Sequence, residues 1–368
     1  MPQNSPSFAQ LQSIASQFSG IGTVISVSPF GSGNINDTFL VNVEGGQFQR
    51  FVLQRINTQV FRQPHLVMQN MRAFSEHVQS NSGLHPTRRW EVPHVLCARD
   101  GSNSYVEDEL FWRSISFIEG SQTFDTVQSL EHASEAGFGL GLFHRSVADL
   151  STAKMADTLP GFHITPSYLQ EFLVAQETKI IPKSPEVTYC LKFIAGRQEW
   201  ATVLEDAKAA GELPLRTIHG DPKINNFLID NTTNHCISLI DLDTVKPGLV
   251  HYDIGDCLRS GCNPLGEETA DWQAVHFEPE LGQAMLQGYL ESASAFLVDR
   301  DYDYIYDCMR LIAFELGIRF FTDYLNGSVY FKTQYPEHNL SRALVQFRLA
   351  ESIESQENTI NKIIQDVR

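Results

Sequence analysis

Positive charge is scarce in this sequence. Its 368 residues carry 27 Lys and Arg against 44 Asp and Glu, so the formal net charge is −17. A chain this acidic lacks the basic surface with which proteins bind nucleic acids, and an anionic membrane surface would repel it. We therefore expect neither a nucleic acid nor a membrane among its partners.

Long apolar runs and paired cysteines are missing as well. No stretch approaches the ~18 apolar residues of a membrane span, and the N-terminus has neither the basic stretch nor the apolar core of a signal peptide. The six cysteines are scattered and form no CxxC pair, which argues against a zinc site. With 42% hydrophobic and 19% charged residues, the composition is that of a folded globule. We expect a soluble, cytoplasmic protein with reduced thiols.

Alternation of apolar and polar residues predicts a small β-rich lobe at the start of the chain. The expected strands cover residues 24–30, 37–43, 48–56, 92–98 and 109–120, and the expected helices cover 8–18 and 64–80. Short connections join the first three strands, so we expect an antiparallel meander. Residues 1–119 should form one lobe with about five strands.

After Gly120 the pattern becomes helical. The expected helices cover residues 127–150, 166–180, 185–210, 269–296, 303–325 and 340–365, and a strand-rich insert at 215–245 interrupts them. The predicted fold class is therefore α+β with two lobes. A small antiparallel β-rich lobe (1–119) is followed by a larger helical lobe (120–368).

Residues 219–243 contain the candidate chemistry, in the segments HGDPKINNFLID and ISLIDLD. The apolar parts of these segments predict a β-hairpin. In a register without a bulge Asp230 pairs with Ile237, and Asn226 then lies opposite Asp241. Two oxygen ligands that converge in this way suit Mg²⁺. Asp221, in the loop before the hairpin, could accept a proton from a substrate hydroxyl.

A base beside a metal site is what phosphoryl transfer requires. The alternative is a polar β-turn whose acidic residues only accept hydrogen bonds from the backbone. Because Asp221, Asn226 and Asp241 occur together with a hairpin, the catalytic interpretation is favoured.

The motifs HGDPKINN and IDLDT resemble the catalytic and metal-binding segments of the aminoglycoside phosphotransferase/choline kinase superfamily, which has the protein-kinase-like fold. The resemblance runs over nearly the whole chain and is closest to the bacterial N-acetylhexosamine 1-kinases. The segments that carry it are PFGSGNINDTFLV, LQRINTQVF, FIEG, LIDLDTVKPG, YDIGDCLRSG, GIRFFTDYLNG and VYFKTQYPEHNL.

This resemblance implies a role for each residue of the centre. Asp221 is the catalytic base and contacts the acceptor, while Asn226 and Asp241 bind Mg²⁺. The implied donor is ATP and the implied acceptor is a sugar. Asp243 is a second candidate metal ligand, because alternation along a strand would point it the same way as Asp241. It could equally be a solvated turn residue. Three further residues are expected to brace the loop without touching substrate: His219, Asp253 and Asp256.

A glycine-rich turn and a missing lysine mark the predicted nucleotide site. Gly31, Ser32 and Gly33 lie between two strands, where glycine lets backbone N–H groups approach phosphate, although such a segment can be a plain turn. Members of the superfamily usually carry a lysine on the third strand that pairs with the phosphates. Here Gln54 occupies that place, and Arg55 points to the opposite face.

The segment SFIEG at 116–120 ends the small lobe and is the expected hinge. The resemblance implies that adenine binds there, with Phe117 and Glu119 as the candidate contacts. A plain strand end is the alternative.

Arg319 lies within an apolar helical stretch, where a guanidinium needs a partner. Glu315, four residues earlier, could form an ion pair with it. The resemblance implies instead that Arg319 lines the acceptor pocket and donates hydrogen bonds to sugar oxygens, and this interpretation is favoured. Tyr330 and Asn34 are further candidates for contacts with the acceptor.

Three functions remain open. The leading one is a kinase that transfers the γ-phosphoryl group of ATP to the anomeric hydroxyl of N-acetylglucosamine or N-acetylgalactosamine. The second is a kinase for choline or an aminoglycoside. The third is a non-catalytic, pseudokinase-like binding module, which Gln54 favours and the intact acidic residues disfavour. The last helix is expected to be a packing element or the surface of a homodimer.

Overall fold

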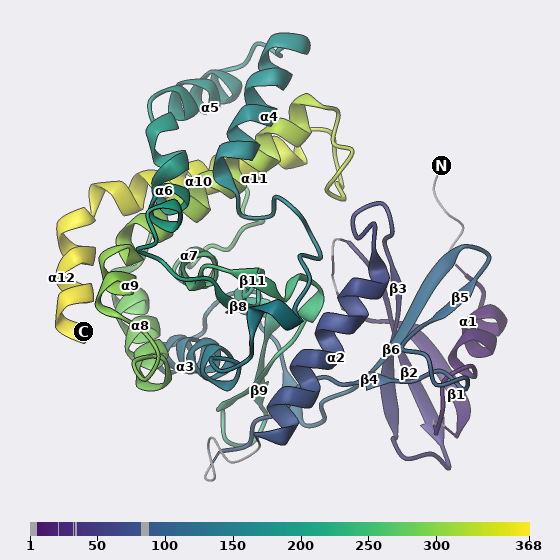
Figure 1. The fold of residues 1–368 in the computed structure, drawn as a ribbon. Coiled ribbons are helices and arrows are strands. Elements are labelled where there is room, and N and C mark those ends of the chain that lie inside the picture. Colours follow the sequence, from purple (N-terminus) through teal and green to yellow (C-terminus); the bar gives the residue numbers. More distant parts are fainter. Residues whose placement is uncertain (1–5, 21, 32, 34, 82–87) are drawn as a thin grey trace.

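The computed structural model describes residues 6–20, 22–31, 33, 35–81 and 88–368, which form two lobes (Figure 1). The N-terminal lobe is built on an antiparallel sheet, and the C-terminal lobe is mostly helical. This confirms the two-lobe α+β architecture expected from the sequence.

The sheet of the N-terminal lobe has the strand order β1-β2-β3-β6-β4, and β5 pairs with β6. The elements of this lobe are α1 (Phe8–Ala15), β1 (Thr23–Pro29), β2 (Asp37–Glu44), β3 (Arg50–Ile56), α2 (Pro64–Ser80), β4 (Val95–Leu96), β5 (Tyr105–Glu107) and β6 (Leu110–Ser116). The predicted meander of the first three strands is confirmed. The strand expected at 92–98 keeps only two residues, because Pro93 has no N–H group for a ladder. The short strand β5 was not expected.

The two faces of this sheet contact different cores. Phe39, Leu53 and Trp112 pack on one face in a cluster that includes residues of α1. Ile56 and Phe111 lie on the other face, where they pack in the core that also contains α2 and the helical lobe. Side chains two residues apart on a strand share a face, so this second face looks toward the C-terminal lobe.

The C-terminal lobe is a bundle around one largely buried helix, α10. Its helices are α3 (Leu130–Ser146), α4 (Thr165–Thr178), α5 (Pro185–Ala195), α6 (Val203–Ala209), α7 (Val250–Gly261), α8 (Pro279–Ala293), α9 (Asp299–Asp303), α10 (Ile305–Leu325), α11 (His338–Ser355) and α12 (Glu357–Val367). Helices α3 and α8 cross at very close range. A Cβ atom on Gly288 would lie 2.0 Å from the carbonyl oxygen of Ser134, so only glycine fits there.

Two helices that the periodicity predicts as continuous are divided. The stretch 185–210 forms α5 and α6 with a 3₁₀ turn (Gln198–Thr202) between them, and 340–365 forms α11 and α12, which meet at Gln356. Five apolar residues of the last stretch are buried within the chain, which confirms their packing role; they are Leu344, Phe347, Ile353, Ile360 and Ile364. The homodimer stays a prediction.

The C-terminal lobe also contains short strands, most of them from the predicted insert. They are β7 (Ser121–Gln122), β8 (Arg216–Ile218), β9 (Phe227–Asp230), β10 (Cys236–Leu239) and β11 (Lys246–Gly248). Strand β9 pairs with β10 and β7, and β8 pairs with β11. As a result, the loop 219–226 and the segment 240–244 lie next to each other at the base of the space between the lobes.

Asn70 ties α2 to this base. Its fully buried amide donates to the carbonyl oxygens of Ala156 and Val245, both at 2.8 Å, and accepts from the N–H of Ala156 at 2.9 Å. The helix that separates the sheet from the C-terminal lobe in Figure 1 is thereby fixed to the segment that follows the candidate metal site. Among the described residues, no helix is both long and apolar enough to cross a membrane.

Candidate active site

The turn at 219–221 is held by a buried carboxylate. Asp253 on α7 accepts from the backbone N–H of His219 at 2.7 Å and from that of Gly220 at 2.8 Å. Gly220 has φ +89°, and a Cβ atom there would meet the carbonyl oxygen of Thr244 at 2.8 Å. His219 is buried and contacts the carbonyl oxygen of Ile240 through Nε2 at 2.9 Å. The bracing roles expected for His219 and Asp253 are confirmed.

A second clamp on the same turn comes from His163, a residue that the sequence did not single out. Its Nδ1 lies 3.0 Å from the Glu315 carboxylate and its Nε2 lies 2.7 Å from the carbonyl oxygen of Gly220. Both partners only accept, so both ring nitrogens carry protons and the imidazole is charged. Burial opposes this charge, but Glu315 raises the pKa of His163 above its ordinary value. A buried ion pair therefore fixes the turn from the side of α10.

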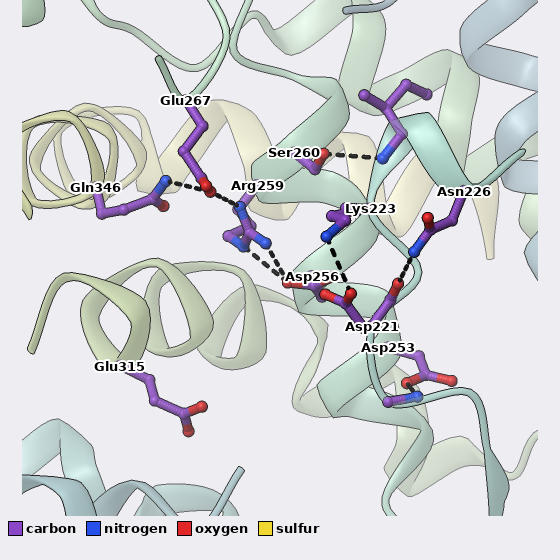
Figure 2. A network of polar contacts seen from close by, with 12 residues as sticks. Asp221, Lys223, Asn226, Asp253, Asp256, Arg259, Ser260, Glu267, Glu315 and Gln346 are labelled. Carbon is purple, nitrogen blue, oxygen red and sulfur yellow. Dashed lines mark hydrogen bonds and ion pairs between the residues drawn. The ribbon is translucent and has the colours of Figure 1, made fainter. Parts of the chain in front are cut away.

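Asp221, the expected base, is partly open to solvent. One carboxylate oxygen lies 3.2 Å from Nζ of Lys223, and 29% of its side chain is exposed. The surrounding protein opposes ionisation, but Lys223, Arg259 and His219 lower the pKa of Asp221 below its ordinary value. The carboxylate is therefore ionised at neutral pH and ready to accept a proton. Figure 2 shows Lys223 pointing at it.

Asn226 is oriented by the catalytic loop itself. Its buried amide nitrogen donates to the backbone carbonyl of Asp221 at 2.7 Å. No described residue donates to its Oδ1. This bond fixes the amide plane, so that the oxygen is left to bind a cation.

The predicted hairpin register is wrong by one residue. Leu239 pairs with Phe227 and Cys236 with Ile229, with an irregularity between Cys236 and Ser238. The residue that bonds to Asn226 across the hairpin is therefore Ile240, whose N–H donates to its carbonyl oxygen at 2.9 Å. A bulge adds one residue to one strand, which alternation alone does not reveal.

Asp241 follows directly and leaves the strand in a left-handed conformation, with φ 67° and ψ 60°. Such a conformation is strained for a residue with a side chain and is typical of functional sites. Neither carboxylate oxygen has a hydrogen-bond or ion-pair partner among the described residues. The side chain is exposed to the cleft.

The electrostatics of Asp241 fit a cation site. Desolvation by the cleft walls, together with the negative charges of Asp243 and Asp221, raises its pKa to about 7. Because the side chain is exposed, the neighbouring carboxylates weigh more in this shift than burial does. A divalent cation bound by Asp241 and by Oδ1 of Asn226 would relieve this repulsion, and these hard oxygen ligands suit Mg²⁺. Among the described residues, no group of three or more His, Cys, Asp and Glu side chains forms a metal site.

Asp243 has neither of the roles expected for it. It is 3% exposed, forms an ion pair with Arg113 of β6, and accepts from Nδ2 of Asn36 at 2.5 Å. The left-handed residue and the 3₁₀ turn after it (Leu242–Thr244) break the alternation that pointed Asp243 toward the metal. Its carboxylate is committed to the N-terminal lobe.

Behind the catalytic loop lies a second buried charge network (Figure 2). Asp256 on α7 pairs with Arg259 at 2.6 Å, and Arg259 pairs with Glu267 at 2.9 Å. Ser260, on the same helix, accepts from the N–H of Ile224 at 2.9 Å. Helix α7 thus supports the catalytic loop through Asp253 and Ser260. Asp256 pairs only with Arg259 of its own helix among the described residues, so its expected bracing of the loop stays a prediction.

A cavity of about 640 Å³ contains the predicted acceptor residues Arg319 and Tyr330. It lies between the segment after β3 and residues 157–160, α4 and the end of α10. The predicted ion pair of Arg319 with Glu315 is absent, because Glu315 binds His163 and accepts from Thr165 at 2.7 Å.

Arg319 instead lies among aromatic rings. Its guanidinium is 5.0 Å from the ring centres of Phe162 and Tyr168 and 5.6 Å from that of Phe331. It makes no hydrogen bond or ion pair with a described residue. Burial opposes its charge, but Tyr168 and Tyr330, followed by Glu315 and Asp221, raise its pKa. The guanidinium therefore has no polar partner among the described residues, and it lies within the field of Asp221, the predicted base.

The nucleotide side is only partly described. Gly31 has φ +74° and Gly33 is exposed, as the glycine-loop prediction requires, whereas Ser32 and Asn34 lie outside the described residues. The ring of Phe117 lies edge-on to Phe30 at 5.8 Å.

The other two predicted nucleotide residues are tied to neighbouring side chains. Glu119 forms an ion pair with Arg50. Gln54 donates from Nε2 to Oγ1 of Thr38 at 3.0 Å and accepts from Nε of Arg113 at 2.8 Å. The proposed contacts of these residues with nucleotide stay predictions.

A comparison with known protein families decides the identity of this arrangement. Residues 26–294, well over half of the chain, match the phosphotransferase enzyme family. The chain belongs to this family. The resemblance drawn from HGDPKINN and IDLDT is therefore confirmed at the level of the family.

Solved structures similar to this phosphotransferase agree on its fold. An aminoglycoside phosphotransferase from Alicyclobacillus acidocaldarius is 16% identical, with a TM-score of 0.61 over 99% of this chain and 98% of that one. A microcompartment-associated aminopropanol kinase is 17% identical, with a TM-score of 0.59 over 96% and 98%. The choline kinase of Cryptosporidium parvum is 16% identical, with a TM-score of 0.57 over 92% and 91%. The protein-kinase-like fold is confirmed, and the acceptor is left open.

Three residues of the candidate site were not predicted from the sequence. Lys223 lies within the HGDPK motif and could have been found there. Arg113 shares a sheet face with Gln54, and alternation along β6 would have shown this. His163 is a lone histidine in a loop, and nothing near it in the sequence indicates its role.

Replacing Asp221 by Asn tests the base. We expect kcat to fall by at least ~10²-fold, because general-base catalysis contributes on that scale. Nucleotide affinity, measured by calorimetry, should stay close to that of the wild type. A variant that keeps more than about a tenth of wild-type kcat would remove Asp221 from this role.

Replacing Asn226 and Asp241 by Ala tests the shared cation. Each change should weaken Mn²⁺ binding in the presence of ADP, measured by electron paramagnetic resonance, and D241A should abolish Mg²⁺-dependent turnover. Because both residues act on one ion, the double variant should lose less than the sum of the single losses. Asp206→Ala, an exposed acid on α6, is the control. Additive losses would show that the two residues do not share an ion.

The charged His163 predicts a pH-dependent stability. Its folded pKa lies above the ordinary 6.5, so its contribution is complete below about pH 6.5 and is lost as the pH rises through the folded value. His163→Gln, which does not titrate, should therefore be less stable than wild type by about 1–3 kcal/mol near pH 6. This gap should narrow toward alkaline pH in thermal melts. A gap that does not change with pH would mean that His163 is neutral in the folded protein.

Proposed function

We propose that this phosphotransferase is an ATP-dependent sugar kinase that phosphorylates the anomeric hydroxyl of N-acetylglucosamine or N-acetylgalactosamine. The observation that carries the acceptor class is the charge inside the acceptor cavity. Arg319 is a guanidinium with no counter-ion among the described residues, and it would repel a cationic acceptor but can donate hydrogen bonds to the oxygens of a neutral sugar.

The carboxylates of the cavity wall support this choice. Asp157 pairs with Lys246 at 2.8 Å. Asp323 accepts from three consecutive backbone N–H groups, including that of Tyr330 at 2.9 Å, and from Asn339. Only Glu171, exposed at the rim, is left among the wall carboxylates for a cation. By contrast, the aromatic rings around Arg319 suit the C–H faces of a sugar ring.

Each part of the site has a place in the reaction. The acceptor oxygen forms a bond to the γ-phosphorus of ATP while the bond from that phosphorus to the β–γ bridging oxygen breaks, and ADP leaves. Asp221 accepts the proton of the attacking hydroxyl. Lys223 balances the negative charge beside it. Mg²⁺, held by Asn226 and Asp241 when bound, would neutralise the phosphate oxygens.

A kinase for a cationic acceptor is the second candidate. The structural neighbours include proteins named for choline, aminopropanol and aminoglycosides, and Glu171 could receive an ammonium group. A screen of both hexosamines, choline and an aminoglycoside for ADP release separates the two. ³¹P NMR of the product should show phosphate on C1. Turnover of choline or the aminoglycoside without turnover of either sugar would contradict the proposal.

Arg319→Met tests the acceptor role directly. We expect kcat/KM for the hexosamine to fall by the equivalent of about 1.5–3 kcal/mol, the usual loss for a hydrogen bond to a charged group. The KM for ATP should change little. The melting temperature should also change little, because Glu315 keeps His163 and Thr165 as partners.

Arg310→Met, on the same helix and paired with Asp307, is the matched control. It should leave the kinetics for the sugar unchanged. A large drop in melting temperature of R319M with an unchanged KM for the sugar would assign Arg319 a structural role instead.

A further inference from the structure

The N-terminal lobe lacks the usual lysine on β3, yet a buried cation lies next to its place. Thr38 on β2 pairs with Gln54 on β3, and Gln54 pairs with Arg113 on β6. Directly paired residues of neighbouring strands point to the same face of a sheet. Gln54 and Arg113 also lie two residues from Ile56 and Phe111, which face the C-terminal lobe. The row Thr38–Gln54–Arg113 therefore faces the space between the lobes.

The neutral amide of Gln54 orients this cation. It accepts from Nε of Arg113 at 2.8 Å and donates to Thr38 at 3.0 Å. Both hydrogen bonds fix the plane of the guanidinium relative to the sheet. Gln54 thus holds an arginine from the next strand at the place where other kinases of this fold carry the lysine itself.

Arg113 has binding capacity that the protein does not use. It is 1% exposed, and its Nη2 pairs with Asp243, but Nη1 has no hydrogen-bond partner among the described residues. A buried, unsatisfied donor on a charged group is costly, and native proteins rarely keep one without a ligand. A phosphate oxygen is a strong acceptor for a guanidinium.

The other cations of the sheet are engaged elsewhere. The strands of the N-terminal sheet carry only three basic residues, Arg50, Arg55 and Arg113. Arg50 pairs with Glu119 at the far end of β3, where its guanidinium lies over Phe117. Arg55 pairs with Asp37 and lies over Trp112, on the opposite face. Arg113 is therefore the one strand cation buried on the side of the cleft.

The partners of Arg113 connect the two halves of the predicted nucleotide site. Asp243, two residues after the candidate metal ligand Asp241, also accepts from Asn36, which lies between the glycine loop and β2.

We propose that Arg113 supplies from strand β6 the cation that binds the phosphates of the nucleotide, in place of the lysine on β3. This inference rests on the proposed nucleotide-dependent kinase activity. Gln54 positions the guanidinium and Asp243 anchors it through Nη2. Nη1 donates to a phosphate oxygen when the nucleotide is bound.

The test compares Arg113→Met with wild type in the full-length protein. Affinities for Mg-ADP and for adenosine are measured by calorimetry, and folding by thermal melts. R113M should bind ADP at least about tenfold more weakly, the scale of one charged hydrogen bond. Adenosine, which has no phosphate, should bind as to wild type. Arg55→Met, on the opposite face of the sheet, is the matched control and should bind ADP normally.

A second variant distinguishes the loss of a phosphate contact from a folding defect. R113M leaves the buried carboxylate of Asp243 without its cation, which could destabilise the fold. The double variant R113M/Q54K restores a positive charge from β3, because a lysine at position 54 can reach the space that the Arg113 guanidinium occupies. It should recover most of the affinity for ADP. Unchanged ADP binding by R113M overturns the proposal. Equal losses for ADP and adenosine that R113M/Q54K does not recover also overturn it. If wild type itself binds no Mg-ADP and phosphorylates no acceptor, the proposed function fails first, independently of Arg113.

Discussion

The geometry of the site depends on how one turn, residues 219–221, is held in place. Asp253 is fully buried, and it accepts from two successive backbone N–H groups and from His144 at 2.8 Å. Burial opposes its ionisation, but His144 lowers its pKa below the ordinary value. On the other side, the charged His163 donates to the carbonyl oxygen of Gly220. One buried anion and one buried cation thus fix a backbone conformation that only glycine adopts without strain, and Asp221 follows directly from it.

The part of the site that lies within one short segment could be predicted from the sequence. Asp221, Asn226 and Asp241 stand within 21 residues of chain, and a hairpin between them brings its two ends together whatever its exact register. The register itself was wrong, because the bulge near Ile237 and the left-handed Asp241 leave no mark in the apolar pattern. Periodicity predicted the overall fold, but it did not predict the helix breaks after Ala195 and at Gln356. Apolar spacing shows which face is buried but not where the backbone bends.

Contacts between distant elements could not be predicted. Glu315 and Arg319 have the spacing of a helical ion pair, yet His163 and Thr165 reach Glu315 from about 150 residues earlier. Local spacing shows which partners are within reach, while the fold decides which of them is used. The same holds for Asp243, whose partners Arg113 and Asn36 lie in the other lobe. In both cases a carboxylate that was expected to act within its own segment, Glu315 or Asp243, instead connects separate parts of the chain.

The distribution of charge also shows why net charge says little about substrate. The chain carries −17 overall, yet three of its cations lie around the candidate site. Arg113 pairs with Asp243, Lys223 lies beside Asp221, the predicted base, and Arg319 lines the candidate acceptor cavity. In the proposed reaction, Asp241 and Asp221 would provide the negative charge that binds a metal ion and accepts a proton. A polyanionic donor would meet positive charge on both sides of the metal, and a neutral acceptor would meet a single guanidinium.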